Sequence, residues 1–141
     1  MSEATSHREV LAAQSGPGGG WGYAPEQPAH LEPTCLALLA LAREPRFGSE
    51  VGKAKDWLRQ CAADDGTYRL ERGREEAVWP TALVLFVQSA LGGEAVELER
   101  TAAALLARKG RQTDPSPDDD VNDIDLKLNG WPWAEGNFSW V

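Results

Sequence analysis

The chain has 141 residues, 42 % of them hydrophobic, and its 22 acidic and 14 basic side chains give a net charge of −8. This length suits one globular domain, and the acidic balance argues against general binding to nucleic acid or anionic membranes, which require a surface rich in Lys and Arg. The longest apolar stretch, 36–42, is far shorter than the roughly 20 residues of a membrane span, and residues 1–8 lack the apolar run of a signal peptide. We therefore expect a cytoplasmic protein without a transmembrane segment.

The sequence contains two similar segments, in which a glutamine, a glycine-containing turn and an aromatic residue precede an apolar stretch that opens with proline. The aromatic residue and the proline are 12 residues apart in both segments. A third copy begins at the Gly-Trp pair 130–131, so the aromatic positions are 47 and then 63 residues apart. The motif positions are Gln14, Gly20, Trp21, Pro33, Gln60, Gly66, Tyr68, Pro80 and Gly130.

Each copy predicts a pair of helices. Proline in a first turn loses no helical hydrogen bond, so Pro33 and Pro80 indicate the starts of two largely apolar helices, about 33–43 and 80–91. More amphipathic helices follow, about 50–63 and 94–109. The Pro- and Asp-rich segment 113–125 accounts for the longer second interval. Because no segment shows strand periodicity with hairpin signals, the sequence predicts an all-α fold.

The two cysteines and one tryptophan of these helices are expected in the interior. Cys35 and Cys61 lie in apolar contexts without CxxC spacing or an adjacent histidine. We expect two reduced thiols that pack as small hydrophobic residues. Trp57, on the face of the helix it shares with Cys61, is expected to pack in the core.

The pattern of Gln, Gly-Gly-Gly-Trp-Gly-Tyr and Glu-Pro-Thr resembles the prenyltransferase and squalene oxidase repeat. This repeat occurs in squalene-hopene cyclases, oxidosqualene cyclases, protein prenyltransferase β subunits and bacterial proteins that share it. The resemblance extends from about residue 8 to the end of the chain. It implies an α/α toroid, with inner and outer rings of helices joined by Gly-aromatic turns. In such a fold, Gln14 with Trp21, and Gln60 with Tyr68, would fasten neighbouring helices.

The resemblance also implies the domain organisation. Residues 1–141 would form one partial toroid domain, with repeat 1 at about 8–49, repeat 2 at about 50–93 and repeat 3, truncated, at about 94–141. About two and a half helical repeats do not close a ring. We therefore expect a fragment of a longer protein, whose open repeat edge can associate with another copy.

Two kinds of chemistry known from this family are weakly represented. The cyclases use an Asp-x-Asp-Asp acid, whereas this chain has the acidic runs 118–120 and 123–125, which we interpret as a solvated loop rather than a catalytic acid or a Ca²⁺ or Mg²⁺ site. A prenyltransferase-like zinc site would have to use His30, Glu32 and Cys35, which lack the Asp-x-Cys spacing. We expect no metal and no cofactor, and the catalytic residues, if any, are unknown.

Five residues are candidates for ligand binding. Glu32 opens the first apolar helix, where its carboxylate either interacts with the helix dipole or faces the central cavity of a toroid. The other four are aromatic and either pack in turns and core or line an apolar site, as aromatic faces that stabilise carbocations do in cyclases. They are Tyr23, Trp79, Trp131 and Trp133.

The favoured function is that of a scaffold or a binder of an apolar, isoprenoid-like small molecule, without a recognisable active site in this chain. One alternative is an N-terminal fragment of an isoprenoid cyclase or prenyltransferase whose catalytic residues lie beyond Val141. Another is a toroid that recognises protein or peptide through its concave face. The sequence leaves open whether the protein is an enzyme.

Overall fold

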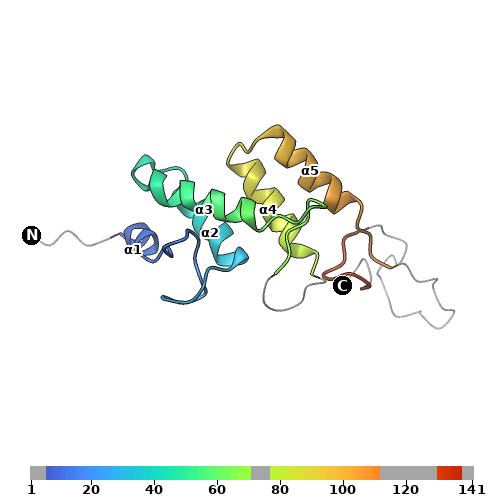
Figure 1. The fold of residues 1–141 in the computed structure, drawn as a ribbon, viewed down its shortest axis with the longest axis horizontal. Helices are drawn as coiled ribbons and strands as arrows, with labels where there is room; N and C mark the ends of the chain where they lie inside the picture. The colour runs from blue at the N-terminus through green and yellow to red at the C-terminus, as the bar shows by residue number, and fades with distance from the viewer. Residues whose placement is uncertain (1–5, 71–76, 112–129, 138–141) are drawn as a thin grey trace, which may run out of the picture.

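The computed structural model describes residues 6–70, 77–111 and 130–137. Within these ranges the secondary structure is helical and contains no strand, which confirms the all-α class for the described part of the chain (Figure 1). The elements are α1 (His7–Ala13), α2 (Leu31–Leu41), the 3-10 turn η1 (Pro45–Phe47), α3 (Gly48–Gln60), α4 (Trp79–Ala90) and α5 (Ala95–Leu106). The acidic segment 113–125 lies outside the described residues.

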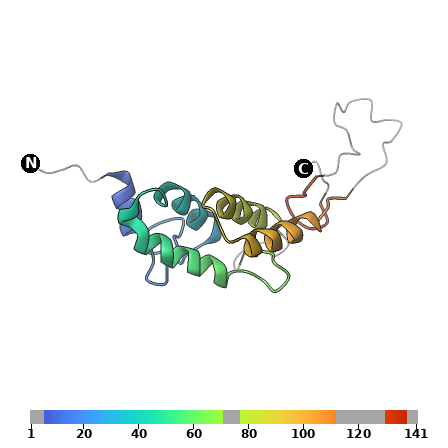
Figure 2. The ribbon, with the colours of Figure 1, turned by 90° about the horizontal axis from the view of Figure 1, so that it is seen from above.

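The helices form two layers. Figure 2 shows α2 and α4 side by side in one layer and α1, α3 and α5 in the other. Helix α2 contacts α1, α3 and α4, and α4 also contacts α5. The two largely apolar helices of the sequence therefore share a layer, and the more amphipathic helices α3 and α5 cover one side of it.

The four expected helices all end earlier than predicted, and all but α5, which begins at Ala95, also begin earlier. Helix α2 starts at Leu31 and α4 at Trp79, so Pro33 and Pro80 still lie in the first turn, where a missing N–H breaks no helical hydrogen bond. Helices α3 and α5 each end three residues before the expected position, at Gln60 and Leu106.

Helix α1 was not expected from the sequence. It begins with a capping box, in which the Ser6 hydroxyl accepts the N–H of Glu9 and the Glu9 carboxylate accepts the N–H of Ser6. Ion pairs from Arg8 to Glu44, at 2.6 Å, and from Arg46 to Glu9, at 2.5 Å, connect it to η1. These side chains are largely exposed, so the pairs orient α1 more than they stabilise it.

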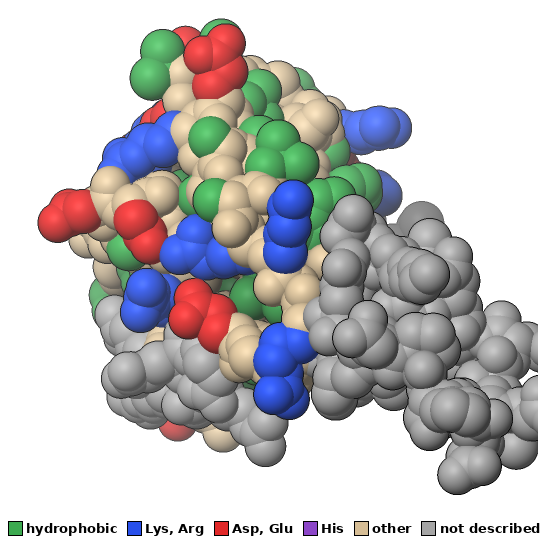
Figure 3. All heavy atoms as spheres, turned by 90° about the vertical axis from the view of Figure 1, so that its right-hand side faces the viewer, with side chains coloured by type: hydrophobic (Ala, Val, Ile, Leu, Met, Phe, Trp, Pro, Cys, Tyr) green, Lys and Arg blue, Asp and Glu red, His purple; other side chains and the backbone are tan. Residues whose placement is uncertain are grey.

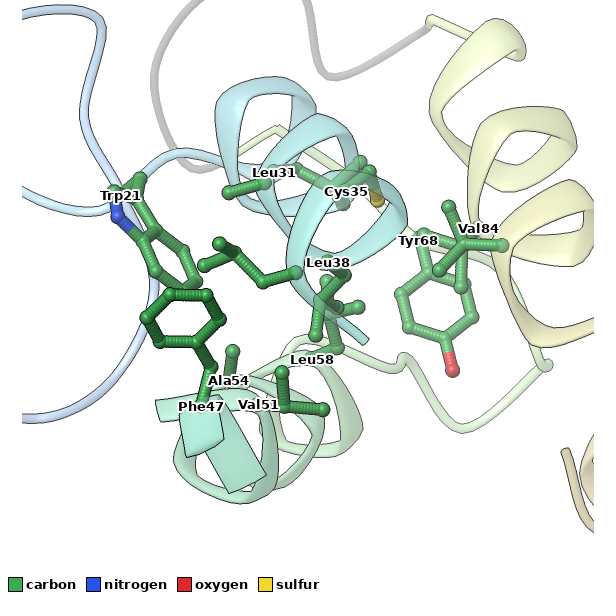
Figure 4. Packing of buried hydrophobic residues seen from close by; sticks show 13 residues of the cluster. Trp21, Leu31, Cys35, Leu38, Phe47, Val51, Ala54, Leu58, Tyr68 and Val84 are labelled. Atoms are coloured by element: carbon green, nitrogen blue, oxygen red, sulfur yellow. The ribbon is translucent and has the colours of Figure 1, made fainter. Parts of the chain in front are cut away.

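One hydrophobic core joins the two layers (Figure 4). Leu38 of α2 lies between aromatic residues of the turns and aliphatic residues of α3 and α4. Cys35 is fully buried, and burial raises the pKa of its thiol to about 12, so at neutral pH it packs as a small hydrophobic residue. Cys61 is half-buried, and both cysteines are reduced thiols. Trp57 packs against this core from α3.

A buried threonine anchors each aromatic residue that precedes an apolar helix. The Thr34 hydroxyl accepts the backbone N–H of Trp21 at 2.9 Å and donates to the Trp21 carbonyl at 3.3 Å. Thr81 makes the same two contacts with Tyr68, at 3.0 and 3.5 Å. Both threonines are essentially inaccessible to solvent. These pairs are 47 residues apart in the chain.

The turns that carry the aromatic residues also share their backbone bonding. In each, an N–H just after an outer-layer helix donates to the carbonyl of the residue before the aromatic one. The three bonds are Gly16 to Gly20 at 2.9 Å, Ala63 to Thr67 at 2.8 Å and Gly110 to Gly130 at 3.2 Å. The donors are 47 residues apart, as the sequence pattern requires.

Glycine is required where these turns approach the next helix. Gly19 and Gly66 have φ of 88° and 82°, a region that side-chain-bearing residues avoid. A Cβ on Gly19 would lie 2.5 Å from the Lys53 carbonyl oxygen of α3, and one on Gly66 would lie 3.0 Å from the Arg100 carbonyl oxygen of α5. Each turn therefore contacts the backbone of the following outer-layer helix at an equivalent residue.

Two tryptophan side chains close the ends of outer-layer helices. The indole N–H of Trp21 donates to the carbonyl of Leu11 at 2.7 Å, and that of Trp131 donates to Leu105 at 2.9 Å. Each carbonyl also accepts a backbone N–H at the end of its helix, from Gln14 at 3.1 Å and from Arg108 at 3.0 Å, so the indole adds a second hydrogen bond there. The Trp131 bond spans 16 more residues, the length by which the second interval exceeds the first.

The expected glutamine fasteners do not use these side-chain groups. Trp21 bonds to Leu11 rather than to Gln14. The Tyr68 hydroxyl accepts a hydrogen bond from Gln88 of α4, at 3.1 Å, rather than from Gln60. The partners lie instead on α1 and α4.

The apolar helices differ in the positions that they expose. Phe86 of α4 is 61 % exposed, whereas Leu39, the equivalent residue of α2, is partly buried against the core. We call Ala82, Leu85 and Phe86 the leading face of α4. The equivalent positions of α2 are Cys35, Leu38 and Leu39. Cys35 and Leu38 are 0 % exposed. Figure 3 looks at this end of the molecule, where hydrophobic side chains gather between charged ones.

The opposite difference occurs on the other side of α2. Leu36 is 55 % exposed, whereas its equivalent Leu83 is partly buried. We call Pro33, Leu36 and Ala40 the trailing face of α2; the equivalent positions of α4 are Pro80, Leu83 and Val87. Because α2 and α4 contact each other, we infer that the trailing positions of α4 cover the leading positions of α2.

Replacing Thr34 or Thr81 with valine is expected to destabilise the protein by about 1–3 kcal/mol, because a buried backbone N–H loses its acceptor while the side-chain volume is kept. Urea unfolding followed by circular dichroism measures the change. Thr101→Val is the control, since the equally buried Thr101 hydroxyl donates to the Glu97 carbonyl within α5 and also contacts the Tyr68 side chain, but accepts no backbone N–H of the described turns. Equal costs at the three positions would contradict an anchoring role.

Candidate functional site

A cavity of about 450 Å³ lies between the first turn, helix α3 and the residues that follow the second turn. Its volume falls within the range of small-molecule sites. Its walls are mainly aromatic and aliphatic, and one basic residue, Arg69, contributes to them. The apolar and aromatic wall residues include Tyr23, Leu31, Trp57 and Leu70, joined by His30 and Cys61.

The first turn forms one wall because its two ends are held together. The backbone N–H of His30 donates to the Trp21 carbonyl at 2.8 Å, and the rings of Tyr23 and His30 lie 4.8 Å apart, tilted by 46°. Between them, Glu26 adopts a positive φ of 64°, which reverses the chain. The opposite wall comes from α3, where Trp57 and Cys61 are four residues apart and share a helix face.

Glu32 and Tyr23 form a hydrogen-bonded pair at the first turn of α2. The Tyr23 hydroxyl donates to the Glu32 carboxylate at 2.5 Å. Partial burial, this hydrogen bond and the charge of Glu32 raise the pKa of Tyr23 to about 12. The structure therefore brings two of the five candidate residues together, and of the five, Tyr23 lines the cavity.

The other three candidates lie elsewhere. Trp79 and Trp133 stack with ring centroids 5.6 Å apart, and the backbone N–H of Val78 donates to the Trp133 carbonyl at 2.9 Å. Trp131 is tied to Leu105 of α5. These tryptophans connect the third turn to α4 and α5, which is the packing alternative considered for them.

The described residues provide no metal centre. Among them, no group of three or more His, Cys, Asp or Glu side chains is placed to hold an ion. His30, Glu32 and Cys35 are thus not assembled as zinc ligands. The aspartates of 118–120 and 123–125 lie outside the described ranges.

Sequence reasoning did not identify several cavity residues. His30 was considered only as a metal ligand, yet its Nδ1 is buried at the cavity wall without a hydrogen-bond partner in the described structure. Arg69 and Leu70 follow the second turn and carry no motif. The one sequence feature that pointed to this wall was the four-residue spacing of Trp57 and Cys61, which predicts that both lie on the same face of their helix.

No protein-family model matches the chain, and no curated protein does either. None of the helices in the described ranges has the length and apolar character that a bilayer span requires.

The Tyr23–Glu32 pair can be tested by titration. In a Tyr68→Phe background, Tyr23 is the one remaining tyrosine of the two in the chain, and its tyrosinate absorbance should appear near pH 12. Glu32→Gln should shift this midpoint towards the ordinary value of about 10, because the acceptor charge is lost. An unchanged midpoint would contradict the pairing.

The same pair contributes to stability in a defined pH range. The pKa of Tyr23 is higher in the folded state than in the unfolded state, so its contribution is fully present below about pH 10 and is lost as pH rises towards 12. The Glu32→Gln variant should show a smaller loss over this range than its parent.

Proposed function

We propose that this chain is a helical-repeat protein of the kind found in prenyltransferase and squalene oxidase repeats, and that it binds an apolar, isoprenoid-like small molecule. The cavity of about 450 Å³ beside the first turn carries this proposal. Aromatic and aliphatic wall residues favour an apolar ligand through the hydrophobic effect, because ligand binding removes apolar surface from water.

Recurring contacts support the repeat architecture. The threonine anchors, the turn bonds and the glycine approaches all recur at an interval of 47 residues. The tryptophan bonds to Leu11 and Leu105 extend the pattern to a third copy. The two-layer arrangement, with apolar helices on one side, is what a toroid of inner and outer helices would display over part of its circumference.

The position of the cavity supports a role in binding. It lies between the turns of two successive copies, at Tyr23 and Leu70, which are equivalent positions 47 residues apart. The walls are therefore held by the same contacts that hold the helices. Such a preorganised site loses little conformational entropy when a ligand enters.

Geraniol, a short isoprenoid alcohol, is a suitable probe. Isothermal titration calorimetry should show saturable binding to the unmodified chain. Cys61→Phe should weaken binding at least about tenfold, because the larger ring occupies the cavity. Cys61→Ser is the matched control, since it changes the same residue without adding volume and should retain binding.

Circular dichroism of both variants establishes that the helical content is unchanged. Absence of geraniol binding to the unmodified chain, or equal binding to the Cys61→Phe variant, would reject this cavity as the apolar site.

A further inference from the structure

Among the described residues that line the cavity, one side chain is permanently charged. Arg69 is charged at any physiological pH, and its side chain is 52 % exposed. Among the other wall residues, the Tyr23 phenol is neutral because its pKa lies at about 12. As far as the described residues form the wall, a ligand in this cavity encounters the positive charge of Arg69 beside apolar surfaces.

Within the described residues, Arg69 has one distant carboxylate partner. Its ion pair is with Asp65, at an N–O distance of 3.7 Å. Asp65 is occupied by closer partners: the Thr67 hydroxyl and backbone N–H donate to Oδ1 at 2.5 and 3.0 Å, and Arg108 donates to Oδ2 at 2.8 Å. These contacts, the Thr67 hydroxyl foremost, lower the pKa of Asp65 to about 2, and they also direct its carboxylate towards Thr67 and Arg108.

From this arrangement we infer that the ligand is an apolar monocarboxylate, whose carboxylate pairs with Arg69 while its hydrocarbon body contacts Tyr23, Trp57 and Leu70. The inference rests on the proposed function, because it specifies the head group of a ligand for the same cavity. A guanidinium and a carboxylate can form two parallel hydrogen bonds, which makes one arginine sufficient for one carboxylate.

The presence of one arginine in the described wall disfavours two other head groups. A diphosphate carries several negative charges and is usually held by several cations or a metal, whereas the described wall offers one arginine. An ammonium group would be repelled by Arg69. A neutral alcohol would gain the apolar contacts alone.

Three ligands that share one hydrocarbon skeleton separate these cases. Geranic acid, geraniol and geranylamine carry a carboxylate, a hydroxyl and an ammonium group at neutral pH. In isothermal titration calorimetry with the unmodified chain, geranic acid should bind at least about tenfold more tightly than geraniol, and geranylamine should bind most weakly.

The variant Arg69→Gln should abolish the preference for geranic acid and leave the affinity for geraniol unchanged. Arg43→Gln is the control, because it removes the same charge from an exposed residue that does not line the cavity, and it should retain the preference. Circular dichroism and thermal melting of both variants show whether the fold is kept.

Each outcome bears on one proposal. Equal affinity for geraniol and geranic acid, or an undiminished preference in the Arg69→Gln variant, would overturn the carboxylate inference and leave the apolar site intact. Binding of geranic acid that is insensitive to Cys61→Phe would place it outside the cavity and overturn the inference as well. Failure of geraniol to bind the unmodified chain would reject the proposed function itself, whatever the affinity for geranic acid.

Discussion

The two layers depend on a hydroxyl that serves as both acceptor and donor. Thr34 lies beside Pro33 in the first turn of α2, where its side chain reaches back to the backbone N–H and carbonyl of Trp21. This fixes the aromatic residue at the start of the apolar helix. The glycine run immediately before Trp21 can then approach the backbone of α3, because Gly19 has no Cβ to meet the Lys53 carbonyl. One threonine thus connects a helix of one layer to the next helix of the other, and the same turn supplies a wall of the cavity.

Local features of the sequence predicted much of this fold. A proline followed by a continuous apolar run specifies a buried helix whether or not its neighbours are known, so α2 and α4 were placed to within two residues at their starts. The helix α1 was missed because its pattern covers only seven residues, although the Ser6–Glu9 capping box was a readable signal. The true partners of Trp21 and Tyr68 were missed for another reason. They lie on neighbouring helices, and the distance between helices is set by packing that no local pattern encodes.

The candidate site was less predictable than the fold. Glu32 and Tyr23 were each identified, but their pairing depends on the reversal at Glu26, where a residue other than glycine adopts a positive φ. The cavity itself results from the passage of the first turn across Trp57 of α3. Arg69 attracted no attention in the sequence because an isolated arginine is ordinary there. Its significance arises from Asp65, whose carboxylate is directed to Thr67 and Arg108 by contacts that only the folded chain provides.

Within the described residues, no helix covers the leading face of α4 or the trailing face of α2, which raises the question of what could pack there. These are the two faces that the contact between α2 and α4 does not use. Neither contains a charged side chain, as is typical of interface cores. A second copy stacked in the same register would bring its α2 against the leading face of α4. However, Leu11 of α1 accepts the indole N–H of Trp21 just as Leu105 of α5 accepts that of Trp131, so α1 and α5 hold equivalent positions relative to these tryptophans. In the stacked arrangement, α1 of the second copy would therefore occupy the same space as α5 of the first. Association that continues the repeat therefore requires α1 to leave α2, at the expense of the Glu9–Arg46 and Arg8–Glu44 pairs and of the packing of Leu11 against the core. An apolar helix that is not preceded by an outer-layer helix would not collide with α5. The leading face of α4 is therefore better suited to such a helix than to α2 of an unchanged second copy.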